Sequence, residues 1–181
     1  GNDTYGFDLE KQKWELISLP YRGDFEFDLP LGLFPDNTPG PIHTYNRIQY
    51  WPKNNSLYVF GREYNHYGGK TYHYISYLNL SKPNVNDRAN WFNLPPNYWG
   101  RFKSGSSSCY DKETDKMWVL GAGVASDNFG SLDLYTNETN TYDKDYYRDE
   151  NNITYDDAYY STADCAMGLF VYTSHKAKSI M

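Results

Sequence analysis

Three short apolar segments, each preceded by a polar turn, recur along the chain. They are Leu57-Tyr58-Val59-Phe60-Gly61, Met117-Trp118-Val119-Leu120-Gly121 and the weaker Leu169-Phe170-Val171-Tyr172. A tyrosine, Tyr50 or Tyr110, stands seven residues before each of the first two segments. Short apolar segments that follow polar turns are typical of β-hairpins, so the pattern predicts one hairpin repeated along the chain.

Segments that alternate between apolar and polar residues complete the pattern around these hairpins. Near the beginning of the sequence, Thr4 to Leu9 and Trp14 to Pro20 flank a polar turn and predict a first hairpin. Two later groups repeat one order of strands, which we expect over Ile42 to Tyr50, Leu57 to Gly61, Tyr72 to Leu80 and Trp91 to Leu94, and again over Ser104 to Tyr110 and Met117 to Gly121.

The second group continues with a copy of the first hairpin. Leu132-Asp133-Leu134-Tyr135 resembles Phe7-Asp8-Leu9-Glu10 in its spacing of apolar and acidic residues. After this copy, the sequence predicts that Tyr142 takes the position that Trp14 and Trp91 have in the other groups. Each complete unit would then contain four strands in about 50 residues.

These patterns divide the chain into two complete units and two halves. Residues 1–20 are expected to form the second half of a unit, and 21–41 an irregular loop whose prolines exclude a central strand. A complete unit is expected over 42–100 and another over 101–158, the latter with an acidic, tyrosine-rich insertion. Residues 159–181 supply the first half of a further unit.

Composition favours β structure over helix. Of the 181 residues 19% are aromatic, including 20 tyrosines, and no stretch longer than about two turns has convincing helical periodicity. Aromatic residues are enriched in strands, and a chain of this length can bury a substantial core. We therefore expect an all-β fold with polar loops.

At these positions the sequence resembles the kelch family and, within it, the central propellers of galactose-oxidase-like proteins. The resemblance is carried by His43 to Ile48 with Leu57 to Gly61, by Cys109 to Asp111 with Met117 to Gly121, and by Asp8-Leu9 with Trp14 and Trp91. It implies β-propeller blades of four antiparallel strands. The chain departs from the usual double glycine after the second strand, where it has Gly61-Arg62 and Gly121-Ala122-Gly123.

The units add up to about three blades. The sequence begins with the second half of one blade and ends with the first half of another. In propellers, such offset ends complete one blade together. Closed propellers typically have four to eight blades, so three do not easily surround a channel. We expect the chain to be a fragment of a longer polypeptide, and the alternative is that copies assemble into a ring or an array.

Charge and hydropathy exclude some partners. The net charge is −6 and the acidic and basic residues are interspersed, which argues against a nucleic-acid-binding surface. The sequence contains no apolar stretch approaching the roughly 18 residues of a membrane span, so we expect no membrane insertion.

Cysteines and glycosylation motifs bear on the compartment. Cys109 and Cys165 are the two cysteines, and the sequence leaves open whether they form a disulfide or remain free and buried. Five Asn-X-Ser/Thr motifs occur, where about two are expected by chance. Their asparagines lie in predicted turns, loops or strand ends and predict an extracellular, glycosylated protein; they are Asn2, Asn54, Asn79, Asn137 and Asn152.

The candidate binding residues lie around the loops of one predicted blade. Exposed aromatic rings with polar tips suit stacking on sugars or packing against a protein. These candidates are Tyr64, Asn65, His66, Tyr67, Tyr72 and Trp99. We predict no metal site and no cofactor, although the acidic residues of the insertion at 143–158 offer oxygen ligands for calcium as an alternative to a solvated loop.

No nucleophile–base motif or phosphate-binding loop is present in the sequence. The expected function is therefore a non-catalytic extracellular binding or structural domain that contacts protein or carbohydrate through its loops. One alternative is a carbohydrate-active enzyme of the oxidase or glycosidase type, with catalytic residues partly outside this chain. Another is a self-assembling subunit of a filament or coat, in which blade edges pair between copies.

Overall fold

A computed structural model of the protein describes residues 3–21, 34–36, 38–40, 47–61, 74–81, 90–94, 107–122, 128–142, 162–167 and 169–173. Each of the twelve regular elements in this part of the chain is a β-strand, so the predicted all-β fold is confirmed. Within the same residues, no helix has the length and apolar character needed to cross a membrane.

The strands form two antiparallel sheets of four and two hairpins. The first hairpin consists of β1 (Thr4–Asp8) and β2 (Lys13–Ser18). The first sheet has the order β3 (Ile48–Trp51), β4 (Ser56–Gly61), β5 (Tyr74–Asn79) and β6 (Trp91–Asn93). The second sheet has the same sequential order, β7 (Ser107–Asp111), β8 (Lys116–Ala122), β9 (Asn128–Asp133) and β10 (Thr139–Tyr142). The last hairpin joins β11 (Thr162–Ala166) and β12 (Leu169–Thr173).

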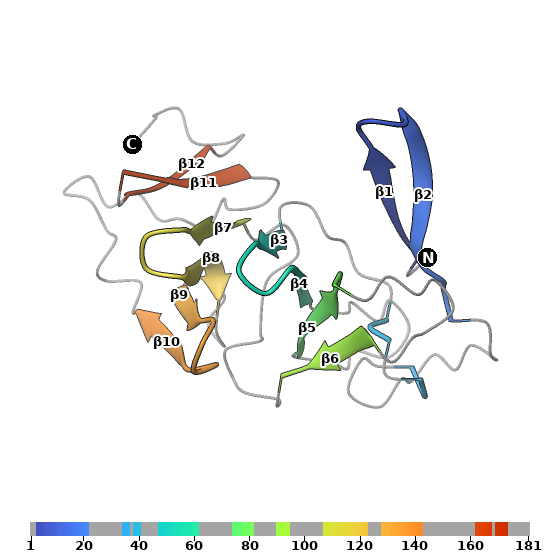
Figure 1. Ribbon diagram of the computed structural model, residues 1–181. Coiled ribbons are helices and arrows are strands. Elements are labelled where there is room, and N and C mark those ends of the chain that lie inside the picture. Colours follow the sequence, from blue (N-terminus) through green and yellow to red (C-terminus); the bar gives the residue numbers. More distant parts are fainter. Residues whose placement is uncertain are drawn as a thin grey trace.

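These four units, which we call layers, follow one another in chain order (Figure 1), with β1–β2 at one end, where it projects from the first sheet, and β11–β12 at the other. Neighbouring residues of a strand point to opposite faces of its sheet, so each inner sheet offers one face to each neighbouring layer. We call the face toward the layer earlier in the chain the N-side face, and the opposite one the C-side face.

A small apolar cluster joins the first hairpin to the first sheet. Val59, Leu78 and Trp91 lie together on the N-side face of the β3–β6 sheet, and Ile17 of β2 packs against them. The Trp91 indole N–H also donates a hydrogen bond to the hydroxyl of Ser18, with an Nε1–Oγ distance of 3.1 Å. The base of the hairpin, at Ile17 and Ser18, therefore contacts the N-side face of the sheet.

A larger cluster joins the two four-stranded sheets in the same sense. On the C-side face of the β3–β6 sheet, Tyr58, Phe60 and Ile75 are buried in one cluster with Met117 and Val119 of β8. Because strand residues alternate, these side chains come from the opposite face to the first cluster. Both faces of the β3–β6 sheet thus carry buried apolar clusters.

The repeated tyrosines have a common structural role beside the first turn of each sheet. The Tyr50 hydroxyl donates to Asn55 Oδ1 at 2.9 Å, and the Tyr110 hydroxyl donates to Asp115 Oδ1 at 2.6 Å. Asn55 and Asp115 have φ values of 52° and 53°, a left-handed conformation that Asn and Asp tolerate better than most residues. The spacing found in the sequence therefore reflects a turn that its own hairpin tyrosine holds.

Three aspartates stabilise hairpin turns, and Asp111 does so in the same turn as Asp115. Asp8, Asp111 and Asp133 each end a strand, and each uses Oδ1 to accept a hydrogen bond from the backbone N–H two residues later, at 3.0 Å in all three. This is the local bond by which Asp favours turns. These aspartates are therefore structural elements of the turns.

The register of the third and fourth strands corrects one prediction. The equivalent pairs are Phe7 with Trp14, Leu78 with Trp91 and Leu132 with Thr139. Thr139 therefore has the position in the second sheet that Trp14 and Trp91 have in the other units. The prediction that Tyr142 has this position is wrong. In β9–β10, as in β1–β2, a four-residue turn follows the aspartate and fixes this register, and Tyr142 lies three residues further along, paired with Phe129.

A leucine follows the Asp or Asn at the end of each third strand and packs toward the preceding layer where one is present. The N–H of Leu80 donates to Asn55 O at 2.8 Å, and that of Leu134 donates to Asp115 O at 3.2 Å. Leu134 is buried in the cluster between the sheets and Leu80 packs on the smaller cluster. Leu9 has the equivalent position in β1–β2 but is exposed.

We expect Leu134→Ala to lower the free energy of unfolding by about 2–5 kcal/mol, because it leaves a cavity between the two sheets. Leu9→Ala at the equivalent position is the matched control and should change it by less than about 0.5 kcal/mol. Urea unfolding of both variants in dilute solution provides the comparison. Similar losses at both positions would contradict the layer arrangement.

Candidate functional site

The binding residues expected from the sequence cannot be placed in the fold. Tyr64, Asn65, His66, Tyr67, Tyr72 and Trp99 all lie outside the described residues, as does the acidic insertion at 143–158. Their roles in ligand binding and in calcium binding therefore stay predictions. In the described part of the chain, His, Cys, Asp and Glu form no group of three or more suited to a metal ion.

The structure instead shows a pocket between the C-side face of the second sheet and the last hairpin. We call it the Trp118 pocket. Its volume is about 270 Å³, and it is lined by Asp111, Glu113, Thr114, Trp118, Phe129, Cys165 and Leu169. The rings come from β8 and β9, the polar groups come from β7 and the β7–β8 turn, and Leu169 comes from β12. The pocket therefore combines an aromatic wall with a polar rim.

Three rings on this face of the sheet stack on one another. The centroids of Trp118 and Phe129 are 5.2 Å apart, and those of Trp118 and Tyr142 are 5.8 Å apart. All three side chains are half-buried. In the repeat, Trp118 corresponds to Tyr58 of the first sheet, whose ring is buried against the next layer. The aromatic wall is thus a layer-packing face that is incompletely covered.

A disulfide fixes the last hairpin over one side of this face. Cys109 of β7 is bonded to Cys165 of β11, with the Cα atoms 5.5 Å apart. The sequence left this pairing open, and the structure forms it. Strand β11 packs beside β7, as β7 itself packs beside β3 of the preceding sheet. The hairpin therefore occupies the place of the first two strands of a further layer.

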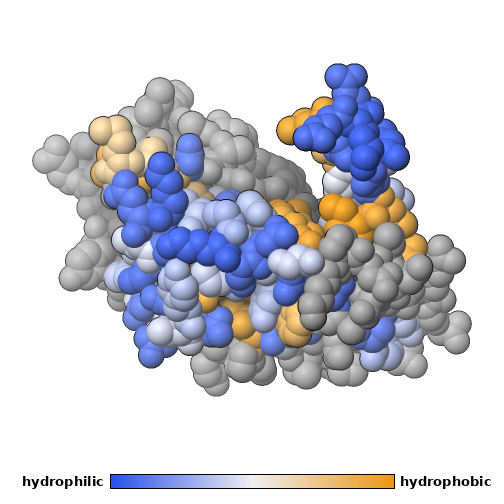
Figure 2. All heavy atoms as spheres, viewed as in Figure 1, coloured by the Kyte–Doolittle hydropathy of each residue, from blue (hydrophilic) through white to orange (hydrophobic). Residues whose placement is uncertain are grey.

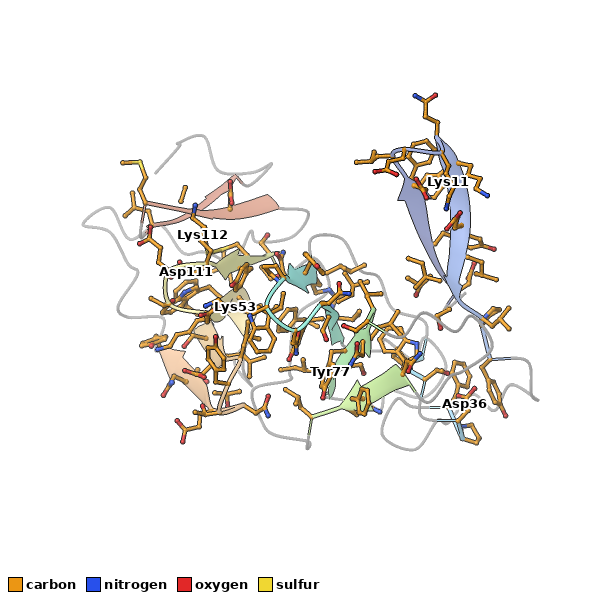
Figure 3. The ribbon with its side chains drawn as sticks, in the orientation of Figure 1. Lys11, Asp36, Lys53, Tyr77, Asp111 and Lys112 are labelled. Atoms are coloured by element: carbon orange, nitrogen blue, oxygen red, sulfur yellow. A yellow bond between two sulfur atoms is a disulfide. The ribbon has the colours of Figure 1, made fainter. Side chains whose placement is uncertain are left out.

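The polar rim of the pocket is held by local hydrogen bonds. Burial disfavours the charged form of Asp111, but the Thr114 hydroxyl and the Glu113 N–H both donate to its carboxylate and together lower its pKa. The Thr114 Oγ1–Asp111 Oδ2 distance is 2.5 Å. Asp111 therefore stays ionised at neutral pH and is suited to accept hydrogen bonds rather than to donate a proton. Figure 3 shows this residue beside the last hairpin.

A second unusual surface is the N-side face of the first hairpin. Tyr5, Phe7 and Trp14 share this face with the adjoining Leu9, and Phe7 and Trp14 make an edge-to-face contact with centroids 5.3 Å apart. Figure 2 shows this hairpin standing clear of the rest of the molecule. The exposed fractions of Phe7, Leu9 and Trp14 are 43%, 82% and 70%, whereas those of their equivalents Leu78, Leu134 and Trp91 are 3%, 3% and 6%.

A buried aspartate connects the two four-stranded sheets. The Asp115 carboxylate accepts hydrogen bonds from the Tyr110 hydroxyl at 2.6 Å, the Trp51 indole at 3.4 Å and the Tyr135 hydroxyl at 3.4 Å. Lys53, which extends from the β3–β4 turn (Figure 3), forms an ion pair with the same carboxylate. We call these five residues the Asp115 cluster.

Trp51 and Lys53 link the Asp115 cluster to the first sheet, while Tyr110 and Tyr135 bind Asp115 within the second sheet. Its partners, Lys53 first and then Tyr110 and Trp51, lower the pKa of Asp115 to about 2 although burial opposes ionisation. Burial and then the bond to Asp115 raise the pKa of Tyr110 to about 12. A carboxylate and a phenol with these pKa values do not exchange protons near neutral pH, so the cluster is structural rather than an acid–base pair.

Three of the five predicted glycosylation sites fall within the described residues. Asn54 and Asn137 are exposed in turns, and Asn79 is partly buried at the end of β5, where its Oδ1 accepts the Ser81 N–H at 2.8 Å. Asn2 and Asn152 lie outside the described residues. Glycosylation stays a prediction at all five.

Comparison with protein-family models found no match, and comparison with curated protein sequences found no significant relative.

Sequence reasoning did not single out the pocket or the exposed hairpin face. Trp118 was visible only as part of a repeated strand, and its neighbour Phe129 was in none of the predicted strands. A signal for the hairpin face was present, because Trp14 was recognised as the equivalent of Trp91. That equivalence predicts a buried Trp14, and only the structure shows that this tryptophan is uncovered.

The low pKa of Asp115 makes the contact between sheets sensitive to acid. The pKa of Asp115 is about 2 in the folded protein, below the ordinary value of 3.8 that we take for the unfolded chain. The ionised carboxylate therefore stabilises the fold at pH values above 3.8, and this stabilisation is lost as the pH falls toward about 2. Asp115→Asn is a matched variant, because Asn55 occupies the equivalent position in the first sheet, where it has the same backbone conformation and accepts a hydrogen bond from Tyr50.

We expect wild-type protein to lose more thermal stability than Asp115→Asn between pH 5 and about pH 2, and the variant to be the less stable of the two at pH 7. Melting temperatures across this interval measure both effects. Equal acid sensitivity in the two proteins would show that the charge of Asp115 does not contribute to the contact between sheets.

Proposed function

We propose that this chain is a non-catalytic binding and structural domain, built of propeller-type blades, that binds protein through the exposed ends of its stack of layers. The observation that carries the proposal is the exposure of Phe7, Leu9 and Trp14, whose equivalents in the inner layers are buried or half-buried. Monomeric proteins rarely expose adjoining apolar residues of this size without a partner. Aromatic rings are also enriched at protein interfaces.

The propeller assignment has two supports. The resemblance to kelch blades predicts four antiparallel strands in sequential order, and both described sheets have that order. The first strands of successive layers also lie beside each other, β3 with β7 and β7 with β11, as the inner strands of neighbouring blades do. Such blades would supply a rigid scaffold, while the exposed faces and loops would make the contacts.

An extracellular location is part of the proposal. The Cys109–Cys165 disulfide supports it, because disulfides persist mainly in oxidising compartments. The exposed asparagines Asn54 and Asn137, each in a glycosylation motif, are compatible with it.

A carbohydrate ligand is the second candidate, and the composition of the Trp118 pocket favours it. Trp118 and Phe129 provide flat apolar faces, while Asp111, Glu113 and Thr114 provide oxygen atoms at the rim. Such pockets, mostly apolar with a few placed polar groups, suit small polar ligands. The ionised Asp111 would accept hydrogen bonds from hydroxyls, which is binding rather than glycosidase acid chemistry.

Protein binding at the hairpin face can be tested by hydroxyl-radical footprinting. We expect Trp14 to be oxidised in the isolated 181-residue chain at low concentration but protected in the native protein as isolated from its source, because a partner would cover it. Tyr135, which is also exposed but lies in the Asp115 cluster, is the internal reference. Equal oxidation of Trp14 in both preparations would contradict the proposal.

Carbohydrate binding predicts a saturable change in tryptophan fluorescence on titration with mono- and oligosaccharides. Trp118→Ala should weaken that binding about tenfold, the loss expected from an aromatic contact of about 1.4 kcal/mol. Trp14→Ala is the control and should leave the affinity unchanged. A titration without saturation would remove this second candidate.

A further inference from the structure

We propose that the exposed face of β1–β2 packs on the C-side face of the β7–β10 sheet in a second copy of this chain. The β1–β2 hairpin of one copy would lie beside the β11–β12 hairpin of the other, and the two hairpins would complete a single four-stranded layer. The inference rests on the proposed function and names the partner of the same surface.

The two hairpins correspond to complementary halves of a layer. Strands β1 and β2 match the third and fourth strands of each sheet, because Phe7–Trp14 pairing and the turn at Asp8 repeat what is seen at Leu132–Thr139 and Asp133. Strand β11 matches a first strand, because it packs beside β7 as β7 packs beside β3. Neither half has a further partner strand among the described sheets.

The two surfaces also match in the contacts they would make. Between the inner sheets, Leu132 and Leu134 pack into the same cluster as Tyr58 and Phe60. In the repeat, Phe7 and Leu9 correspond to the two leucines, and Trp118 corresponds to Tyr58. Docking of two copies would therefore recreate an interface that the chain already forms once within itself.

The receiving surface has room for this docking. The last hairpin lies beside β7, so it covers only one side of the C-side face. Beyond the last hairpin, Trp118 and Tyr142 on this face are half-buried, and Leu169 is exposed at the rim of the Trp118 pocket. An incoming β1–β2 hairpin would cover these rings as Leu132 and Leu134 cover those of the first sheet.

The partner we infer is a second copy because the two half-layers are held apart within one chain. Figure 1 shows β1–β2 and β11–β12 at opposite ends of the molecule, with both four-stranded sheets between them. The hairpins are joined to those sheets by the small apolar cluster at one end and by the disulfide at the other. Contact between two different surfaces gives head-to-tail association, which extends or closes into a ring.

Sedimentation velocity of the 181-residue chain tests the inference. We expect wild-type protein to associate reversibly between micromolar and millimolar concentration, and more strongly at high salt, because copies of net charge −6 repel one another. Phe7→Arg should block one surface and Leu169→Arg the other, each raising the dissociation constant at least about tenfold. Phe92→Arg is the matched control, because Phe92 is exposed to the same 43% as Phe7 but lies on neither surface.

Mixing the two variants gives the sharper result. Phe7→Arg protein keeps its receiving surface and Leu169→Arg protein keeps its hairpin face, so each should be monomeric alone and the mixture should form one-to-one dimers. Unchanged melting temperatures would show that the exposed substitutions leave the fold intact, and Leu9→Arg would replace Phe7→Arg if that variant unfolds.

Three outcomes would overturn the inference: a wild-type chain that stays monomeric throughout, a Leu169→Arg protein that associates alone as strongly as wild type, and a variant mixture that stays monomeric. A monomeric chain whose Trp14 is nevertheless protected in the native protein would assign the hairpin face to a different protein partner and leave the proposed function standing. An unprotected Trp14 would reject the proposed function itself.

Discussion

Burial on both faces is the constraint on which this structure depends. The β3–β6 sheet has apolar residues on both faces, Val59, Leu78 and Trp91 toward one neighbour and Tyr58 and Phe60 toward the other. A sheet of this kind is stable only between two other layers, whereas a sheet with one polar face can stand against water. The layers therefore have to continue until a face is met that is polar or is covered by something else. The exposed rings of β1–β2 show that this chain does not meet such a face at its first layer.

The Asp115 cluster fixes the register between the two sheets, which apolar packing alone would not specify. A carboxylate that accepts bonds from Trp51, Tyr110 and Tyr135 and pairs with Lys53 has few alternative arrangements. Hydrophobic burial is non-directional, and fixed hydrogen bonds select one register between the two surfaces. The equivalent turn of the first sheet has an asparagine and one tyrosine bond. The same backbone turn thus serves either as a local element or as a link between sheets, depending on one side chain.

Much of the fold could be predicted because its determinants are local. The spacing of Tyr110 from its strand, the aspartates of the turns and the alternation within β4 and β8 all act within one hairpin, so the sequence predicted the hairpins and their order. The Asp115 cluster could not be predicted, since it depends on Trp51 and Lys53, more than sixty residues away. The place of Tyr142 was missed because an aromatic residue was matched by type, while the length of the turn sets the register. The Trp118 pocket depends on how far one layer covers the next, which no local pattern records.

The hydrogen bond between each repeated tyrosine and its turn spans only five residues, and this has a consequence for the order in which the chain folds. Hairpins close within microseconds, while contacts between distant segments wait for the entropy of longer loops to be overcome. Each turn thus favours its own hairpin before the neighbouring layer is present. During synthesis, the early hairpins can be ordered while later ones are still being made, and each new layer then meets a preformed surface. Such a chain folds layer by layer from its first hairpin, and the apolar face of the most recently folded layer stays exposed to solvent until the next layer packs on it.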